Sequence, residues 1–181
     1  MVVRRKAIRE HVEAILDEQR IERPAVPVER IAHAYGIQIN RDRIDNEVSG
    51  YLLRSEEHNT VIIGVNGKHS EPRQRFTIAH ELAHYMLHNG ELVHVDGART
   101  GSMLDWRGPA HTGNSEREKE ANLFAAELLM PERFLRQDLR QLENIDLLEK
   151  DVLKVLAKRY EVSAQALTIR LAKLNLVDAA Y

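Results

Sequence analysis

The chain has 181 residues, of which 43% are hydrophobic and 30% are charged, a balance typical of a globular domain and not of a disordered chain. Its net charge of -2 excludes the strong positive field of a protein that coats nucleic acid. The absence of cysteine excludes disulfides, thiolate zinc sites and cysteine nucleophiles, so any metal must be held by histidine and carboxylate side chains. No apolar run approaches the ~18 residues of a membrane-spanning helix and the start has no signal-peptide core, so we expect a cytoplasmic protein.

The N-terminal third predicts two helices followed by a small sheet. Hydrophobic residues at helical spacing predict a helix over about residues 4–19 and a shorter one over 28–35, which ends at Gly36. Three β-branched or aromatic runs follow, separated by polar turns, at residues 37–39, 48–53 and 60–65. We therefore expect a small, mostly antiparallel sheet.

The remainder of the chain is predicted to be helical apart from one long loop. The helical period returns strongly over residues 73–88. Residues 89–114 hold five of the nine glycines and little periodicity beyond a possible extended piece at 92–95, and loops of this length are usually functional or mobile. Four more helices are expected, over residues 115–130, 132–140, 145–159 and 163–173.

The strongest chemical signal lies in the helix predicted over residues 73–88. His80-Glu81-Leu82-Ala83-His84 is an H-E-x-x-H motif, and its two imidazoles, one helical turn apart, can reach the same cation. His80, Glu81 and His84 fall in one sector of this helix, and hydrophobic residues fill the opposite sector. A catalytic zinc ion usually takes three protein ligands and a water, so a carboxylate or a third histidine must complete the set.

The best candidate for that third ligand lies on the helix that follows the long loop. In helical projection, Glu118 shares its half of the helix with small and apolar residues, whereas Glu116, Glu120 and Glu127 cluster on the far side. A buried carboxylate needs a cation or a strong donor, so we predict that Glu118 alone of the four faces inward toward a metal. Asn122, one turn further on, is placed to hydrogen-bond a ligand imidazole and orient it.

Together, these two motifs resemble those of one known family. RFTIAHELAHYMLH followed by EKEANLFAAELLMP resembles the ImmA/IrrE family of metallopeptidases, and the SGYLL and TVIIGVN segments resemble that family's layout. The resemblance implies an α+β, zincin-like metallopeptidase domain with a small antiparallel sheet and a helical C-terminal appendage. It implies a role for each of five residues: His80, His84 and Glu118 as metal ligands, Glu81 as the water-activating general base, and Asn122 as the partner of a ligand imidazole.

The chain departs from the family pattern in two places. Ala83 stands where family members often carry glycine, and the glycine-rich loop between the motifs is a candidate lid or specificity element. The residue that stabilises the oxyanion stays unassigned, with Tyr51, Tyr85, His94 and His111 as candidates, and the loop residue Trp106 is also unassigned.

Three further residues near the motif have structural interpretations. His88 lies near the end of the motif helix, where a cationic imidazole favours the helix dipole, so we favour a structural role for it. Arg73 and Arg75 are candidates for positioning substrate, although pairing at the helix start or on the surface explains them as well.

The C-terminal region, residues 132–181, resembles a helix-turn-helix and follows a peptidase domain that we assign to residues 1–131. It holds nine Lys and Arg against eight Asp and Glu, a weak balance for binding phosphates. We therefore favour packing or partner docking over direct nucleic-acid binding.

The resemblance also implies a reaction and a substrate class. The reaction is metal-assisted hydrolysis of a peptide bond, and the substrate is a DNA-binding, helix-turn-helix repressor that is cut to relieve repression. The ligand types favour zinc, and they also accommodate manganese or iron. The competing hypothesis is a non-catalytic, metal-binding regulator that binds a repressor or DNA.

Overall fold

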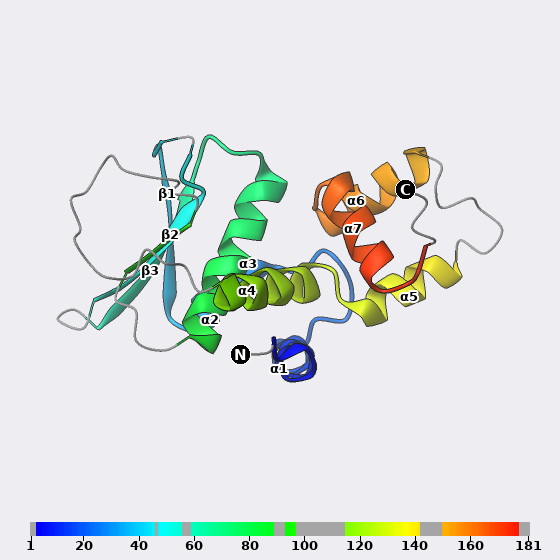
Figure 1. Cartoon of the computed structure of the whole chain (residues 1–181), viewed down its shortest axis with the longest axis horizontal. Helices are drawn as coiled ribbons and strands as arrows, with labels where there is room; N and C mark the ends of the chain where they lie inside the picture. The colour runs from blue at the N-terminus through cyan, green and yellow to red at the C-terminus, as the bar shows by residue number, and fades with distance from the viewer. Residues whose placement is uncertain are drawn as a thin grey trace.

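The computed structural model of the chain describes residues 3–45, 47–55, 59–88, 93–96, 115–141 and 150–177 (Figure 1). In chain order, the elements in these ranges are α1 (Arg5–Glu18), α2 (Val28–Ala34), β1 (Ile37–Asp42), β2 (Gly50–Ser55), β3 (Thr60–Asn66), α3 (Glu71–Leu87), β4 (Val93–Asp96), α4 (Ser115–Leu129), α5 (Glu132–Arg140), α6 (Lys150–Tyr160) and α7 (Ala164–Lys173). The predicted α+β class is confirmed. Within the ranges described, no helix is both long enough and apolar enough to cross a membrane.

Local sequence signals explain where several helices begin and end. α2 ends before Gly36, which has φ +73, a left-handed conformation that glycine adopts without strain. α3 begins at Glu71, two residues before the predicted start, because Pro72 is tolerated in the first turn of a helix. α7 begins after Ser163, whose side chain accepts a hydrogen bond from the backbone N–H of Ala166. The first residues of the helix predicted over 145–159 lie outside the described part of the chain, which resumes at Lys150.

The four strands form a mixed sheet in the order β1-β3-β2-β4. β2 pairs antiparallel with both β3 and β4, as predicted. The expectation is wrong for β1, which runs parallel to β3 with Ile39 opposite Ile63. The reason is topological: β2 and β3 form a hairpin, and β1 pairs with the free edge of β3 instead of with β2, its neighbour in sequence.

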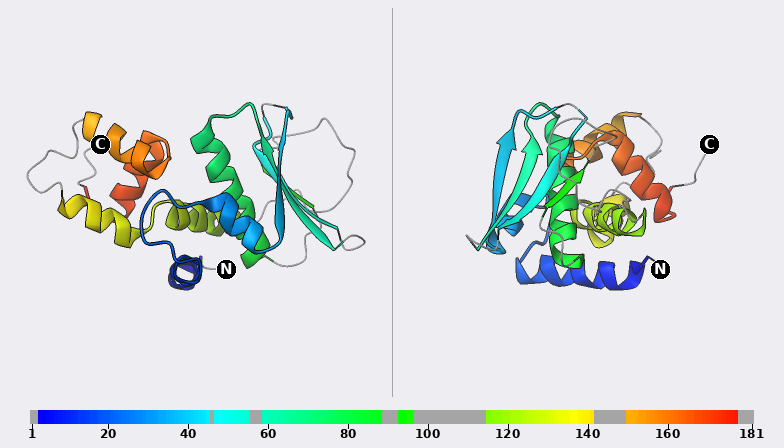
Figure 2. Two further views of the ribbon diagram at one scale, coloured as in Figure 1. Left: turned by 180° about the vertical axis from the view of Figure 1, so that it is seen from behind. Right: turned by 60° about the vertical axis from the view of Figure 1, so that its left-hand side comes forward.

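The elements pack in layers around α3. The sheet covers one side of α3, α4 crosses the other side, and α1 packs against α4 (Figures 1 and 2). β2 approaches α3 closely at Gly50, where a Cβ atom would lie 2.4 Å from Cγ2 of Thr77 and 2.6 Å from the carbonyl oxygen of Gly64. This arrangement buries α3 on two sides and places the H-E-x-x-H motif beside α4.

The helices after residue 131 lie at the end of the molecule away from the sheet (Figure 1). Their hydrophobic side chains belong to the same buried cluster as those of α1, α3 and α4. Arg170 of α7 forms a buried ion pair with Glu127 of α4 and donates to the carbonyl oxygen of Met130 at 3.1 Å. The division of the chain into domains at residue 131 stays a prediction.

Candidate metal centre

The H-E-x-x-H motif lies in the most enclosed part of α3. Every residue from Thr77 to His84 is buried, because the sheet covers one side of α3 and α4 covers the other. His80 and His84 are each 2% exposed, and Glu81 is fully buried. Polar side chains are costly to bury without partners, so this arrangement indicates a functional site and not the solvated face of a surface helix.

Glu118 of α4 forms a cluster of donor atoms, the donor triangle, with His80 and His84, in which each imidazole lies beside a different oxygen of the Glu118 carboxylate. Nε2 of His80 lies 3.1 Å from Nε2 of His84 and 3.3 Å from Oε2 of Glu118, and Nε2 of His84 lies 3.3 Å from Oε1 of Glu118. A tetrahedral zinc ion with bonds of about 2.0–2.1 Å needs its ligand atoms about 3.3 Å apart. Among the residues that the structure describes, this is the one group of three such side chains arranged to hold a metal ion. The three predicted ligands therefore come together and fit a small divalent cation.

The two imidazoles also set the charge of Glu118. Hydrogen bonds from His80 and His84 hold the pKa of Glu118 well below its ordinary value, although partial burial opposes this shift. The Glu118 side chain, which is 34% exposed, is therefore ionised at neutral pH. An anionic oxygen beside two imidazole nitrogens suits zinc and also accommodates manganese or iron.

The prediction that Glu118 alone faces inward is wrong, because two other carboxylates of α4 are buried. Glu120 and Glu127 are 7% and 3% exposed, since α4 packs against α1 and α7 as well as α3. Arg4 donates to Glu120 through its backbone N–H, Nε and Nη2 at 3.0, 3.1 and 2.7 Å. These hydrogen bonds, with the side-chain contribution largest, lower the pKa of Glu120 to about 2 against the opposing effect of burial.

His88 makes buried contacts in place of the dipole interaction predicted for a cation at the helix end. It is 6% exposed, and burial lowers its pKa, so the neutral ring is favoured over the cation expected at a helix end. Its Nδ1 lies 3.1 Å from Nδ1 of His84, and its Nε2 lies 3.3 Å from Oε2 of Glu120. Sequence reasoning therefore underestimated His88 and missed Glu120. The available signal was the spacing of His80, His84 and His88, which puts three histidines on one face of α3.

Asn122 lies outside this group. Its side chain is exposed on α4, and it makes no hydrogen bond to either ligand imidazole in the part of the chain described. The Glu118 side chain, one turn earlier on α4, is partly exposed at 34%, whereas Asn122 is exposed. The orienting contact predicted for Asn122 is therefore not present, and His88 makes the corresponding contact with His84.

Of the four candidates for stabilising the oxyanion, the structure describes Tyr51, Tyr85 and His94 but not His111. The hydroxyl of Tyr51 donates to Oδ2 of Asp42 at 2.7 Å, and burial raises the pKa of Tyr51 to about 12, so this phenol is engaged within the sheet region. His94 belongs to β4, opposite Leu52 of β2. His111 and Trp106 lie outside the described residues, as does most of the predicted lid.

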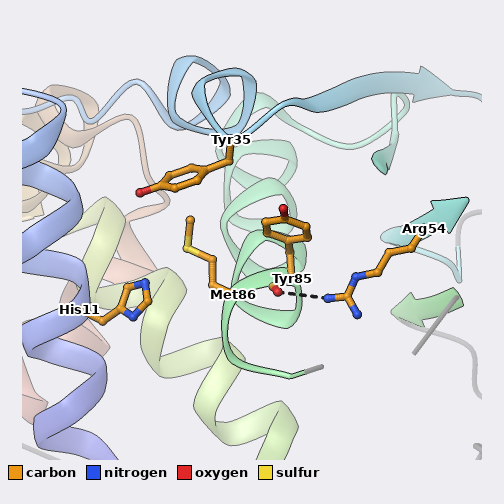
Figure 3. Close-up of a pocket in the computed structure, with 5 residues that line it drawn as sticks. All are labelled: His11, Tyr35, Arg54, Tyr85 and Met86. Atoms are coloured by element: carbon orange, nitrogen blue, oxygen red, sulfur yellow. Dashed lines mark hydrogen bonds between the residues drawn. The ribbon is translucent and has the colours of Figure 1, made fainter. Parts of the chain in front are cut away.

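Tyr85 lies in an open pocket of about 450 Å³ on the surface of α3 (Figure 3). The pocket is also lined by His11, Tyr35, Arg54 and Met86, and so contains none of the candidate ligands. The Arg54 guanidinium carbon lies 5.4 Å from the centre of the Tyr85 ring, and its Nη2 donates to the Tyr85 carbonyl oxygen at 3.1 Å. These contacts tie β2 to the C-terminal end of α3.

The two arginines before the motif make contacts within the chain. Nη2 of Arg73 donates to Oγ of Ser49 at 3.1 Å. Arg75 pairs with Glu161 at 3.0 Å and donates to the carbonyl oxygen of Val26 at 2.7 Å. These contacts favour a structural role for both arginines over a role in positioning the substrate.

A helix that carries two histidines and a glutamate, packed on a small sheet and completed by a carboxylate from a second helix, defines the zincin-like class of metal-dependent peptidases. The chain belongs to the Peptidase_M78 family, whose model, described as IrrE N-terminal-like domain, matches residues 32–172. The resemblance seen in the sequence is confirmed, and the protein is a metallopeptidase, a hydrolase that acts on peptide bonds. No curated protein sequence matches the chain.

Proposed function

We propose that this metallopeptidase is an endopeptidase that cleaves one regulatory protein, a DNA-binding helix-turn-helix repressor, and so relieves repression in the cytoplasm. The observation that carries the catalytic part of the proposal is the cluster of His80, His84 and Glu118, in which the two Nε2 atoms lie 3.1 Å apart and each lies 3.3 Å from one carboxylate oxygen of Glu118. The repressor part is supported by the resemblance of the two motifs to the ImmA/IrrE family.

In this proposal, three side chains hold one divalent cation. Nε2 of His80, Nε2 of His84 and a carboxylate oxygen of Glu118 are the ligands, and zinc is the expected ion, with manganese as the alternative. The bound ion would polarise the peptide carbonyl and make a water molecule more acidic. The site would therefore work near neutral pH.

Glu81 is the proposed general base. It follows His80 directly on α3 and is fully buried beside the ligands. Its carboxylate would accept a proton from the attacking water and return that proton to the leaving amine as the peptide bond breaks. The same carboxylate thus takes part in both proton transfers, and it ends the reaction in the protonation state in which it began.

The C-terminal helices are the proposed docking region for the substrate. Arg170 lies on the second helix of the helix-turn-helix-like pair, where a DNA-binding protein uses basic side chains. It is 3% exposed and pairs with Glu127, so it is not available to a phosphate. This observation supports a role of residues 132–181 in packing and partner docking over DNA binding.

The test is cleavage of a helix-turn-helix repressor encoded beside the gene for this chain, followed by mass spectrometry of the products. The zinc-loaded wild-type protein should cut the repressor at one site. Glu81→Gln should keep its zinc and cut at least ~100-fold more slowly, the scale of a lost general base. Equal cleavage by Glu81→Gln would contradict the assigned base.

Two further variants separate metal binding from catalysis. Glu118→Gln should weaken zinc binding, whereas Glu116→Gln, on the same helix but outside the donor triangle, should bind zinc like the wild-type protein. A wild-type protein that cuts denatured casein but leaves every such repressor intact would contradict the proposed substrate.

A further inference from the structure

A continuous series of side-chain contacts leads away from the candidate ligand His84. Nδ1 of His84, on the opposite side of the ring from the donor triangle, lies 3.1 Å from Nδ1 of His88. Nε2 of His88 lies 3.3 Å from Oε2 of Glu120, and Glu120 accepts three hydrogen bonds from Arg4. The series crosses from α3 to α4 and then to the residue that precedes α1.

When His84 holds a cation, hydrogen-bond chemistry leaves one consistent placement of the protons along this series. His84 must present an unprotonated Nε2 to bind a cation, so its neutral ring carries the proton on Nδ1. Two ring nitrogens form a hydrogen bond only when one carries a proton and the other does not, so Nδ1 of His84 donates to Nδ1 of His88. The neutral ring of His88 then carries its proton on Nε2, which donates to Glu120.

Arg4 explains how the charged carboxylate of Glu120 can be buried at the end of this series. Glu120 is 7% exposed, and a buried carboxylate is costly unless it is paired and hydrogen-bonded. Arg4 supplies a positive charge and three donors, which leaves the carboxylate oriented toward His88. Arg4 precedes the residues that the family model matches, 32–172. The N-terminal segment therefore supports the site from outside that span.

We propose that His88 and Glu120 are positioning residues, which hold His84 in the tautomer and the orientation that bind the metal ion. The proposal rests on the metal site of the proposed function and adds to it two residues that touch neither the ion nor the substrate. Partners of this kind fix the orientation of a ligand imidazole, and their loss typically lowers metal affinity 10–100-fold.

The first test reads the tautomers directly and needs no substitution. The nitrogen chemical shifts of the histidine rings are measured by long-range ¹H–¹⁵N NMR on the full chain, metal-free and zinc-loaded, at about pH 8, above the ordinary imidazole pKa. We expect the proton on Nδ1 of His84 and on Nε2 of His88 in the zinc-loaded chain, whereas in the metal-free chain Nε2 of His84 can donate to Glu118. A zinc-loaded chain in which His88 carries its proton on Nδ1 would overturn the proposal.

The second test compares zinc affinities by competition with a chelator. His88→Leu removes the acceptor and should weaken zinc binding 10–100-fold. His88→Gln keeps an acceptor for His84 and a donor for Glu120, and it should bind zinc within about threefold of the wild-type protein, well inside the range for a lost partner. His11→Leu, at an exposed histidine of α1, is the control and should leave the affinity unchanged.

The outcomes of the affinity test separate the two proposals. Wild-type zinc affinity in His88→Leu would overturn the positioning role alone. Equal losses in His88→Leu and His88→Gln would assign the effect to packing and would also overturn it. A wild-type chain that binds no zinc would overturn the metal site as well.

Discussion

At the scale of single residues, Glu118 and Glu120 of α4 keep their charge because each has specific donors. The two imidazoles beside Glu118 lower its pKa, and Arg4 is the main cause of the lowered pKa of Glu120. Both groups therefore bind fewer protons in the folded chain than in the unfolded chain at acidic pH, and this difference makes stability depend on pH.

The sign of this dependence can be tested at Glu120. Its pKa falls from an ordinary value of 4.5 to about 2 on folding, so its contribution to stability is fully present above pH 4.5 and is lost as the pH falls toward 2. Glu120→Gln should therefore be less stable than the wild-type protein at neutral pH, and the difference should shrink as the pH falls. Urea unfolding of both proteins in the presence of a chelator measures it.

A matched control is Glu10→Gln, which removes an exposed ion pair with Lys6. Exposed pairs of this kind contribute little to stability, so this variant should stay close to the wild-type protein. A stability difference for Glu120→Gln that is the same at every pH would contradict the assignment.

Residue patterns predicted the candidate ligands His80 and His84 because residues at i, i+4 spacing lie on the same face of a helix. The same kind of reasoning failed for Glu120, Glu127 and Asn122. A helical wheel assumes one buried face, whereas α4 is packed by three other helices, so which of its sides are buried depends on tertiary contacts.

At the scale of elements, the absence of a side chain at Gly50 allows β2 to lie close to both α3 and β3. A Cβ atom at Gly50 would lie 2.6 Å from the carbonyl oxygen of Gly64, a backbone atom that cannot move without disturbing the pairing of β2 with β3. The positions of the strands could be predicted from β-branched runs, but the parallel pairing of β1 with β3 could not, because the pattern of hydrophobic residues in a strand does not specify which neighbouring strand it pairs with.

We predict that Gly50→Ala destabilises the chain by about 1–3 kcal/mol, the usual cost of overpacking. Gly67→Ala is the control, since its Cβ would meet its nearest atoms at 3.6 and 3.8 Å, which are ordinary contact distances. Thermal and urea unfolding of both variants would check this prediction. Equal stability of the two variants would show that β2 can shift away from Thr77 and Gly64 at little cost, and would contradict the prediction.

At the scale of the whole molecule, Glu127 connects elements from both ends of the chain. Its carboxylate is 3% exposed, pairs with Arg170 of α7, and lies 3.5 Å from Nε of Arg9 of α1. α4 therefore carries the candidate ligand Glu118 near its start and the anchor of the C-terminal helices near its end. The sequence predicted the helices on both sides, but not an ion pair that joins residues 43 positions apart.

We predict that Arg170→Met destabilises the chain by about 3–5 kcal/mol, because it leaves the charge of Glu127 buried without its main partner. The double variant Glu127→Leu, Arg170→Met removes both charges and should recover most of that loss. The free energies of unfolding of the single and double variants are the measurement. A double variant no more stable than Arg170→Met would show that packing, and not the unpaired charge, causes the loss.

The central claim is that α3 and α4 hold one divalent ion together, and anomalous diffraction at the zinc absorption edge from zinc-loaded crystals tests it most directly. The account predicts one ion bonded to Nε2 of His80, Nε2 of His84 and an oxygen of Glu118, at about 2.0–2.2 Å. An ion bound elsewhere, or a Glu118 carboxylate turned away from both imidazoles, would contradict it.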